Sequence, residues 1–165
     1  MAKKQGKKTW ALILVLLVVV GGSVLFVGAV SGWFSGPAMA EIDAEYYCDN
    51  KCHLGLKDIS ADEYNEMVSS GKSFVIMVDQ GGCKTADKVR EFMGTYSNTR
   101  RFQMFRIMYS GIKETNLAER VEYYPSVAVV SKGKVIAALR ADSDEDAPAY
   151  NNYEDFEKWI NKYVR

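Results

Sequence analysis

The chain has few of the residues that most often bind metals. Its 165 residues include one histidine, His53, and three cysteines, Cys48, Cys52 and Cys83. A zinc site built from three histidines of one chain is therefore excluded by count. A copper or zinc site that combines the cysteines with His53 is chemically allowed, but no further ligand motif supports it. We predict no metal and no cofactor.

Acidic residues are absent from the first 40 positions, where the charged residues are four lysines. All 21 acidic residues follow, together with 17 of the 21 basic ones, so residues 41–165 carry a net charge of −4. A domain that binds nucleic acid usually presents a basic patch. We therefore predict no nucleic-acid partner.

The length and the 48% share of hydrophobic residues fit one globular domain with an appendage.

Charge of either sign is absent from residues 11–30, a run of 20 residues rich in Leu and Val. As a helix this run would span about 30 Å, which matches the hydrocarbon core of a bilayer. Trp10 precedes it and Trp33 follows it, at positions that suit the membrane interface. The preceding lysines predict a cytoplasmic N-terminus and an extracytoplasmic domain. We expect a single-pass anchor in the cell membrane.

The alternative for this segment is a cleaved signal peptide. Residues 38–40 read Ala-Met-Ala, which fits a cleavage site after Ala40. The apolar run is longer than an ordinary signal-peptide core, which favours a retained anchor. Both interpretations place the domain outside the cytoplasm. We divide the chain into an N-terminal tail and anchor (1–34), a linker and Cys-containing extension (35–58), and a folded domain (59–165).

The pattern after residue 58 predicts an α/β domain with a four-stranded mixed sheet and helices on both faces. Ser60 and Glu63 form a capping-box pattern that starts the first helix, whereas residues 41–58 show no periodicity and predict an irregular extension. The further elements expected are strands over 73–78, 102–108, 127–130 and 135–140, helices after Cys83, over 116–121 and over 153–164, and a polar loop over 142–151.

Three of these features resemble the thioredoxin superfamily. The apolar strand Phe74–Val78 leads to Cys83 at a helix N-terminus, Pro125 directly precedes the strand Val127–Val130, and a hairpin and an amphipathic helix end the domain. The resemblance implies a thioredoxin-like fold for residues 59–165 and a cis-proline at Pro125. It also implies that Tyr124 and Pro125 form a substrate-binding wall that faces Cys83.

The active-site motif is degenerate. Redox members of the superfamily have Cys-X-X-Cys at the helix start, but this chain has Ala86 where the second cysteine would stand. Cys83 is expected to be reactive, because a helix N-terminus stabilises a thiolate. Lys84 adds a neighbouring positive charge and is predicted to contribute to substrate binding. A single cysteine can form a mixed disulfide, but a second thiol must release it.

The other two cysteines allow several pairings. An extracytoplasmic setting favours a disulfide between Cys48 and Cys52, and a bridge from either residue to Cys83 remains the alternative. Cys48–His53 is also similar to a c-type haem attachment signature with one residue too many, so no haem is expected.

Two functions follow as hypotheses. The first is a membrane-anchored thiol–disulfide redox protein of the cell envelope, whose partners are protein thiols or disulfides. Its catalytic residues would be Cys83 and Pro125. The second is a non-catalytic adaptor of the same fold that binds an envelope partner, which the missing second cysteine favours. A metal or haem carrier is a third and weaker alternative.

Overall fold

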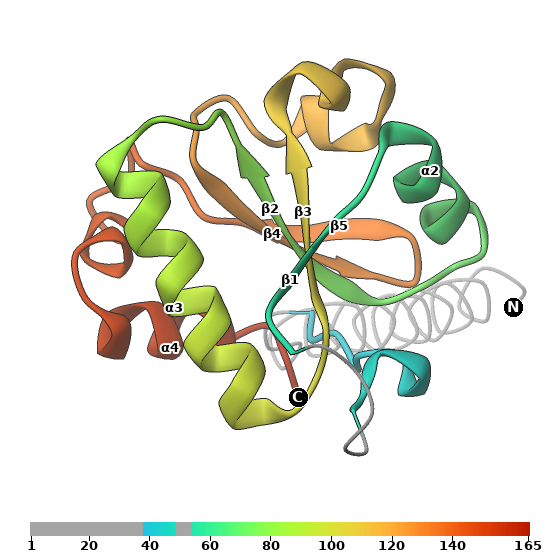
Figure 1. Ribbon diagram of the computed structural model, residues 1–165, viewed down its shortest axis with the longest axis horizontal. Coiled ribbons are helices and arrows are strands. Elements are labelled where there is room, and N and C mark those ends of the chain that lie inside the picture. The colour runs from blue at the N-terminus through green and yellow to red at the C-terminus, as the bar shows by residue number, and fades with distance from the viewer. Residues whose placement is uncertain (1–37, 49–53) are drawn as a thin grey trace, which may run out of the picture. The chain divides into compact units, whose positions relative to one another are not determined.

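The computed structural model describes residues 38–48 and 54–165. They form one mixed sheet with helices on both faces (Figure 1). Five strands lie in the order β1-β3-β2-β4-β5. Their bounds are β1 Leu56–Asp58, β2 Phe74–Asp79, β3 Met104–Met108, β4 Ser126–Ser131 and β5 Lys134–Ala138.

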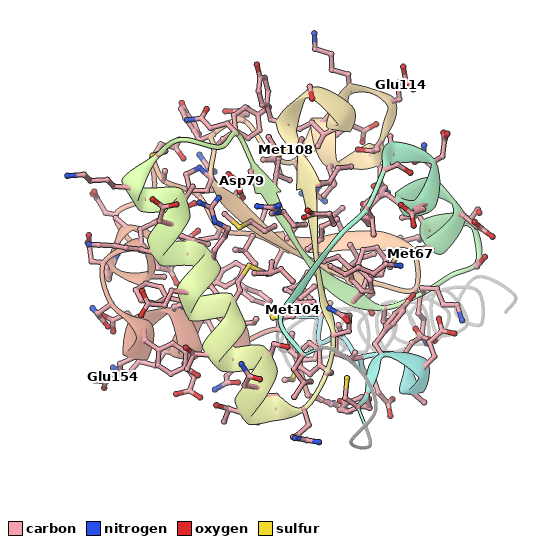
Figure 2. All side chains as sticks on the ribbon, viewed as in Figure 1. Met67, Asp79, Met104, Met108, Glu114 and Glu154 are labelled. Atoms are coloured by element: carbon pink, nitrogen blue, oxygen red, sulfur yellow. The ribbon has the colours of Figure 1, made fainter. Side chains whose placement is uncertain are left out.

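Strand β2 is the centre of the sheet. All six of its residues are buried, which fits a continuous apolar run covered on both faces. It is parallel to β3 and antiparallel to β4. Because β2 and β3 are parallel, their carboxyl ends meet at one edge of the sheet, where Asp79 is in register with Met108. Both side chains lie at that edge in Figure 2.

Helices α3 (Lys84–Arg100) and α4 (Tyr153–Asn161) cover one face of the sheet, and α2 (Ala61–Ser69) covers the other (Figure 1). The apolar spacing after Cys83 predicts an inner face made of Ala86, Val89, Phe92, Met93 and Tyr96. Four of these residues are buried, and Phe92 is partly buried against the same core. The predicted capping box of α2 is also present: the Glu63 amide donates to Ser60 Oγ, and the Ser60 amide donates to the Glu63 carboxylate.

The sheet has five strands instead of the predicted four. Residues 41–58 were expected to be irregular, but β1 lies within them and pairs in parallel with β3. The described part of the expected extension also joins the domain, because Ala40 bridges Val164 and Ile42 is buried in the core. The fifth strand forms because its partner β3 supplies hydrogen bonds that no pattern within a three-residue strand indicates.

Two connecting segments also differ from the prediction. The helix expected over 116–121 is a short 3₁₀ helix, η3 Asn116–Glu119, and another 3₁₀ helix, η2 Tyr109–Glu114, precedes it. The polar loop expected over 142–151 contains a further 3₁₀ helix, η4 Ala147–Tyr150, in which Ala149 and Tyr150 are buried. Another short 3₁₀ helix, η1 Ala44–Tyr46, precedes β1.

Across the described ranges, no helix is both long enough and apolar enough to cross a bilayer. The span predicted over residues 11–30 lies outside those ranges, and the anchor therefore stays a prediction.

Candidate functional site

Cys83 is the N-cap residue of α3 and carries a free thiol. The backbone amides of Ala86 and Thr85 lower the pKa of this thiol, and the Thr85 hydroxyl contributes in the same direction. These amides belong to the first turn of the helix, where backbone N–H groups have no partner within the helix. The site therefore increases the fraction of the thiolate, which is the nucleophilic form of cysteine.

A short glycine loop connects β2 to Cys83. Gly81 and Gly82 have φ angles of 73° and 66°, in the left-handed region that favours glycine. The amide of Gly81 donates to Asp79 Oδ1 at 2.8 Å. This bond holds the loop back onto the end of β2, and it positions the start of α3.

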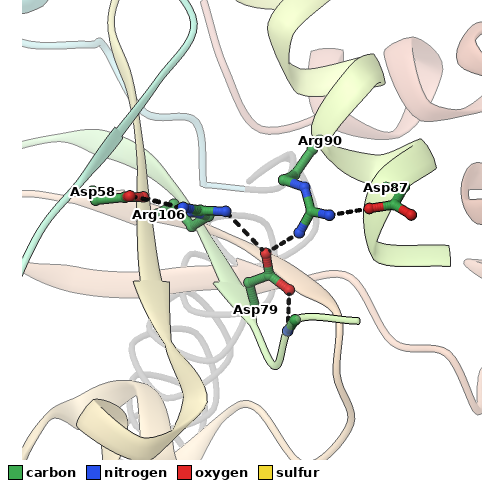
Figure 3. Close-up of polar contacts among 6 residues, drawn as sticks. Asp58, Asp79, Asp87, Arg90 and Arg106 are labelled. Atoms are coloured by element: carbon green, nitrogen blue, oxygen red, sulfur yellow. Dashed lines mark hydrogen bonds and ion pairs between the residues drawn. The ribbon is translucent and has the colours of Figure 1, made fainter. Parts of the chain in front are cut away.

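Asp79 belongs to a network of charged side chains at the edge of the sheet (Figure 3). Its side chain is fully buried, and Oδ2 accepts hydrogen bonds from Arg90 of α3 and, at 3.4 Å, from Arg106 of β3. Asp87 pairs with Arg90, and Asp58 pairs with Arg106. A buried carboxylate requires such partners, because desolvation of an unpaired charge is costly. The network therefore ties β1, β2, β3 and α3 together next to Cys83.

The peptide bond between Tyr124 and Pro125 is cis, as the resemblance predicted. The Tyr150 hydroxyl lies within hydrogen-bond distance of two carbonyl oxygens, that of Pro125 at 3.0 Å and that of Leu139 at 2.9 Å. Tyr150 is buried in η4, so this contact attaches the proline turn to the segment that precedes α4.

Cys83 and the proline turn line one groove. Its volume is about 360 Å³. Three residues of the α3 N-terminus line one side, and the proline turn and residues from the loop before α4 line the rest: Cys83, Thr85, Lys88, Tyr124, Pro125, Ala141, Ala147, Tyr150 and Asn151. The structure thus brings together a partly exposed thiol and the cis-proline from segments 42 residues apart.

Apolar side chains extend this site along the edge of the sheet. Met108 and Tyr109 are 43% and 45% exposed, which is high for large apolar residues. The Tyr109 ring packs against the Tyr124 ring, with centroids 5.5 Å apart. The wall formed by Tyr124 therefore continues into an exposed apolar surface.

Three of the predicted site residues, Cys83, Tyr124 and Pro125, meet at the groove. The other predicted residues do not: Lys84 is exposed outside the groove lining, and Cys48 lies at the opposite end of α3. Lys84 is also not among the groups that lower the Cys83 pKa. Cys52 lies outside the described ranges.

The structure tests the part of the disulfide prediction that concerns Cys48 and Cys83. Cys48 is disulfide-bonded and Cys83 is free, so the alternative bridge from either of the other cysteines to Cys83 is absent. Because Cys52 lies outside the described residues, its pairing with Cys48 remains a prediction.

Sequence reasoning missed several groove and network residues. Thr85 and Lys88 could have been found from their positions within the first two turns after Cys83. Tyr150 ends the short run Ala-Pro-Ala-Tyr, which was the signal for a buried turn within the acidic segment. Asp79 ends an otherwise apolar strand, and a lone charge there indicates a buried partner.

Among residues 38–48 and 54–165, no group of three or more His, Cys, Asp or Glu side chains could hold a metal ion.

The sequence matches no protein-family model and no curated protein. Its structure is similar to thioredoxin O1 from Arabidopsis thaliana in the oxidized state, with a TM-score of 0.50 and 10% identity over 67% of this chain and 99% of that chain. Thioredoxins from Plasmodium falciparum (TM-score 0.49, 14% identity, 68% and 100% covered) and Trypanosoma brucei brucei (0.48, 13%, 67% and 98%) are also similar. Similarity at identities this low shows a shared fold and does not show a shared activity. The domain has a thioredoxin-like α/β fold.

Proposed function

We propose that this protein is a membrane-anchored, extracytoplasmic thioredoxin-like protein that takes part in thiol–disulfide exchange through Cys83. The observation that carries the proposal is the placement of a free thiol at the N-cap of α3, in the same groove as the cis-proline turn. The uncharged run over residues 11–30 and the lysines before it support the anchor and its orientation.

The chemistry begins with attack by the Cys83 thiolate on a disulfide R–S–S–R′. A bond forms between Cys83 Sγ and one sulfur, the original S–S bond breaks, and R′–S⁻ leaves with the electron pair. Amides at the start of α3 stabilise the attacking thiolate. The product is a mixed disulfide between Cys83 and the partner.

The proline turn supports recognition of an extended peptide. Within the described residues, neither the amide nor the carbonyl of Tyr124 has a hydrogen-bond partner. Such groups can pair with the backbone of an added strand. The exposed Met108 and Tyr109 beside them suit apolar side chains of a protein partner. These features favour protein disulfides of the envelope as substrates.

The proposal is tested by trapping mixed disulfides in cells that express the full chain. Cells are quenched with acid and N-ethylmaleimide, and covalent complexes are separated without reductant and identified by mass spectrometry. We expect complexes with envelope proteins that disappear in Cys83→Ser and persist in Lys84→Ser, a change at the exposed neighbouring residue. Complexes of equal abundance in Cys83→Ser, or none in the wild type, would overturn the redox proposal.

One observation favours the second candidate, a non-catalytic adaptor. Ala86 stands where a second cysteine would be expected and is fully buried in the core, so the local site holds one thiol. An adaptor would keep its partner after Cys83→Ser and lose it when the groove is filled, for example by Ala147→Trp. Pull-down of the partner by both variants separates the two functions.

A further inference from the structure

Cys83 and the segment that ends at Cys48 lie at opposite ends of α3. Cys83 precedes the first residue of the helix, whereas Cys48 contacts Arg101, the residue after its last turn. The Cys48 amide donates to the Arg101 carbonyl at 2.8 Å, and Arg101 Nη2 donates to the Cys48 carbonyl at 3.1 Å. At a rise of 1.5 Å per residue, α3 separates the two ends by about 27 Å. In Figure 1, α3 runs from its start toward the lower end of the domain, where residues 38–48 are drawn in cyan.

Strand β2 leads to the same conclusion independently. Asp43 and Ser73 exchange hydrogen bonds at the start of β2: the Asp43 amide donates to the Ser73 carbonyl at 3.1 Å, and the Ser73 amide donates to Asp43 Oδ2 at 2.6 Å. Cys83 follows the other end of that strand. The Cys48 side chain is only 4% exposed. The segment 43–48 is therefore fixed at the end of the domain that lies away from the groove.

The short connection between Cys48 and Cys52 limits how far Cys52 can lie from Cys48. Cys52 is four residues from Cys48, and a fully extended connection of that length spans about 14 Å. This is roughly half the distance from Cys48 to Cys83. Gly55, three residues further on, is a second anchor, because its amide donates to Ser97 Oγ near the same end of α3 at 2.8 Å. A disulfide requires two Cα atoms within about 7 Å of each other, and Cys52 cannot come that close to Cys83.

We infer that a mixed disulfide on Cys83 is released only by a thiol of another molecule. This inference rests on the proposed function. In the second step, an external thiolate R″–S⁻ attacks the partner sulfur of Cys83–S–S–R. The R–S–S–R″ bond forms, the bond to Cys83 breaks, and Cys83 leaves as the thiolate with its electron pair. The chain neither gains nor loses electrons over the two steps, so it exchanges thiol partners between other molecules.

The experiment uses the full chain with all three cysteines reduced under native conditions, then mixed with glutathione disulfide. Intact mass and peptide mapping follow the adduct on Cys83. Without added thiol, we expect the adduct to persist. With added thiol, it should decay at a rate proportional to the thiol concentration. Both results should be the same in the variant Cys48→Ser/Cys52→Ser. Glutathione and a peptide dithiol, added in separate arms, distinguish a small thiol from a protein thiol as the resolving group.

Two outcomes would overturn the inference. One is first-order loss of the adduct without added thiol, at a rate independent of protein concentration and abolished in the double variant. The other is a bridge from Cys83 to Cys48 or Cys52 within one chain after native oxidation by diamide. The diamide map needs no reaction with glutathione disulfide, so it decides the inference even if Cys83 forms no adduct. Failure to form the adduct would count against the proposed function alone.

Discussion

The carboxylate of Asp79 accepts a hydrogen bond from the amide of Gly81 at 2.8 Å, and so joins the end of β2 to the loop that carries Cys83. The other carboxylate oxygen accepts from two guanidinium groups, those of Arg90 and Arg106. One buried side chain thus holds a strand, a helix and the loop between them. Its removal is expected to affect both stability and the position of the thiol.

The first prediction concerns Asp79→Asn. The variant leaves two arginines partly buried without their shared counter-charge, so it should lower the free energy of unfolding by about 3 kcal/mol. Urea denaturation measures the loss. Asp144→Asn, at an exposed position, is the matched control and should stay within about 0.5 kcal/mol of wild type. Equal stability of the two variants would mean that the network contributes nothing to the fold.

A second prediction concerns the hydroxyl of Thr85, which helps to lower the Cys83 pKa. Thr85→Val removes this hydroxyl and keeps the backbone amide, so the pKa of Cys83 should rise. Alkylation by iodoacetamide should then slow at pH 7 and be unchanged at a pH where the thiol is fully ionised. Thr99→Val, on an exposed part of α3, controls for valine in the helix. An unchanged rate at pH 7 in Thr85→Val would exclude a role for the hydroxyl.

The third prediction concerns Tyr150, whose hydroxyl lies close to the carbonyls of Pro125 and Leu139. Tyr150→Phe removes this donor from the Pro125 carbonyl, whereas the Leu139 carbonyl keeps the Ser126 hydroxyl as a donor. The loss of one donor to a buried carbonyl should cost about 1–3 kcal/mol. Thermal unfolding measures the loss, with Tyr123→Phe at an exposed position as the control. If both variants unfold at the same temperature, the proline turn does not depend on this hydroxyl.

Gly133 supports a fourth prediction. Its φ is 75°, and a Cβ added there would lie 2.3 Å from the carbonyl oxygen of Val68. Gly71 has a φ of 70° but no atom within 4 Å of an added Cβ. Gly71→Ala should therefore cost about 1–2 kcal/mol from backbone strain alone. Gly133→Ala should cost clearly more, and equal losses in a urea titration would contradict the close approach.

The sequence was sufficient for the elements that form from local signals. A continuous apolar run predicted β2, the Ser60–Glu63 capping box predicted the start of α2, and the apolar spacing after Cys83 predicted the buried face of α3. In each case the information lies within one segment, because caps and periodicity act over a few residues. The resemblance to thioredoxins added the position of the cis-proline.

Features that depend on distant partners were not predicted. Strand β1 has three residues, and it forms because β3, almost 50 residues later, offers an unpaired edge. Asp79 was not recognised as a network centre, because its arginine partners come from α3 and β3. The distance between Cys48 and Cys83 was likewise hidden, because it depends on the length and direction of α3. Cysteine counting alone left the pairing open.

The central claim is that Cys83 is an accessible thiolate nucleophile beside the proline turn. The most direct test is the rate of Cys83 alkylation by iodoacetamide as a function of pH, measured on the full chain with Cys83→Ser as the blank. The lowered pKa predicts a midpoint clearly below that of a cysteine in an unstructured peptide measured in parallel, because the thiolate fraction sets the rate. A midpoint at or above that of the peptide, or a rate at pH 7 no faster than that of the peptide, would contradict the claim.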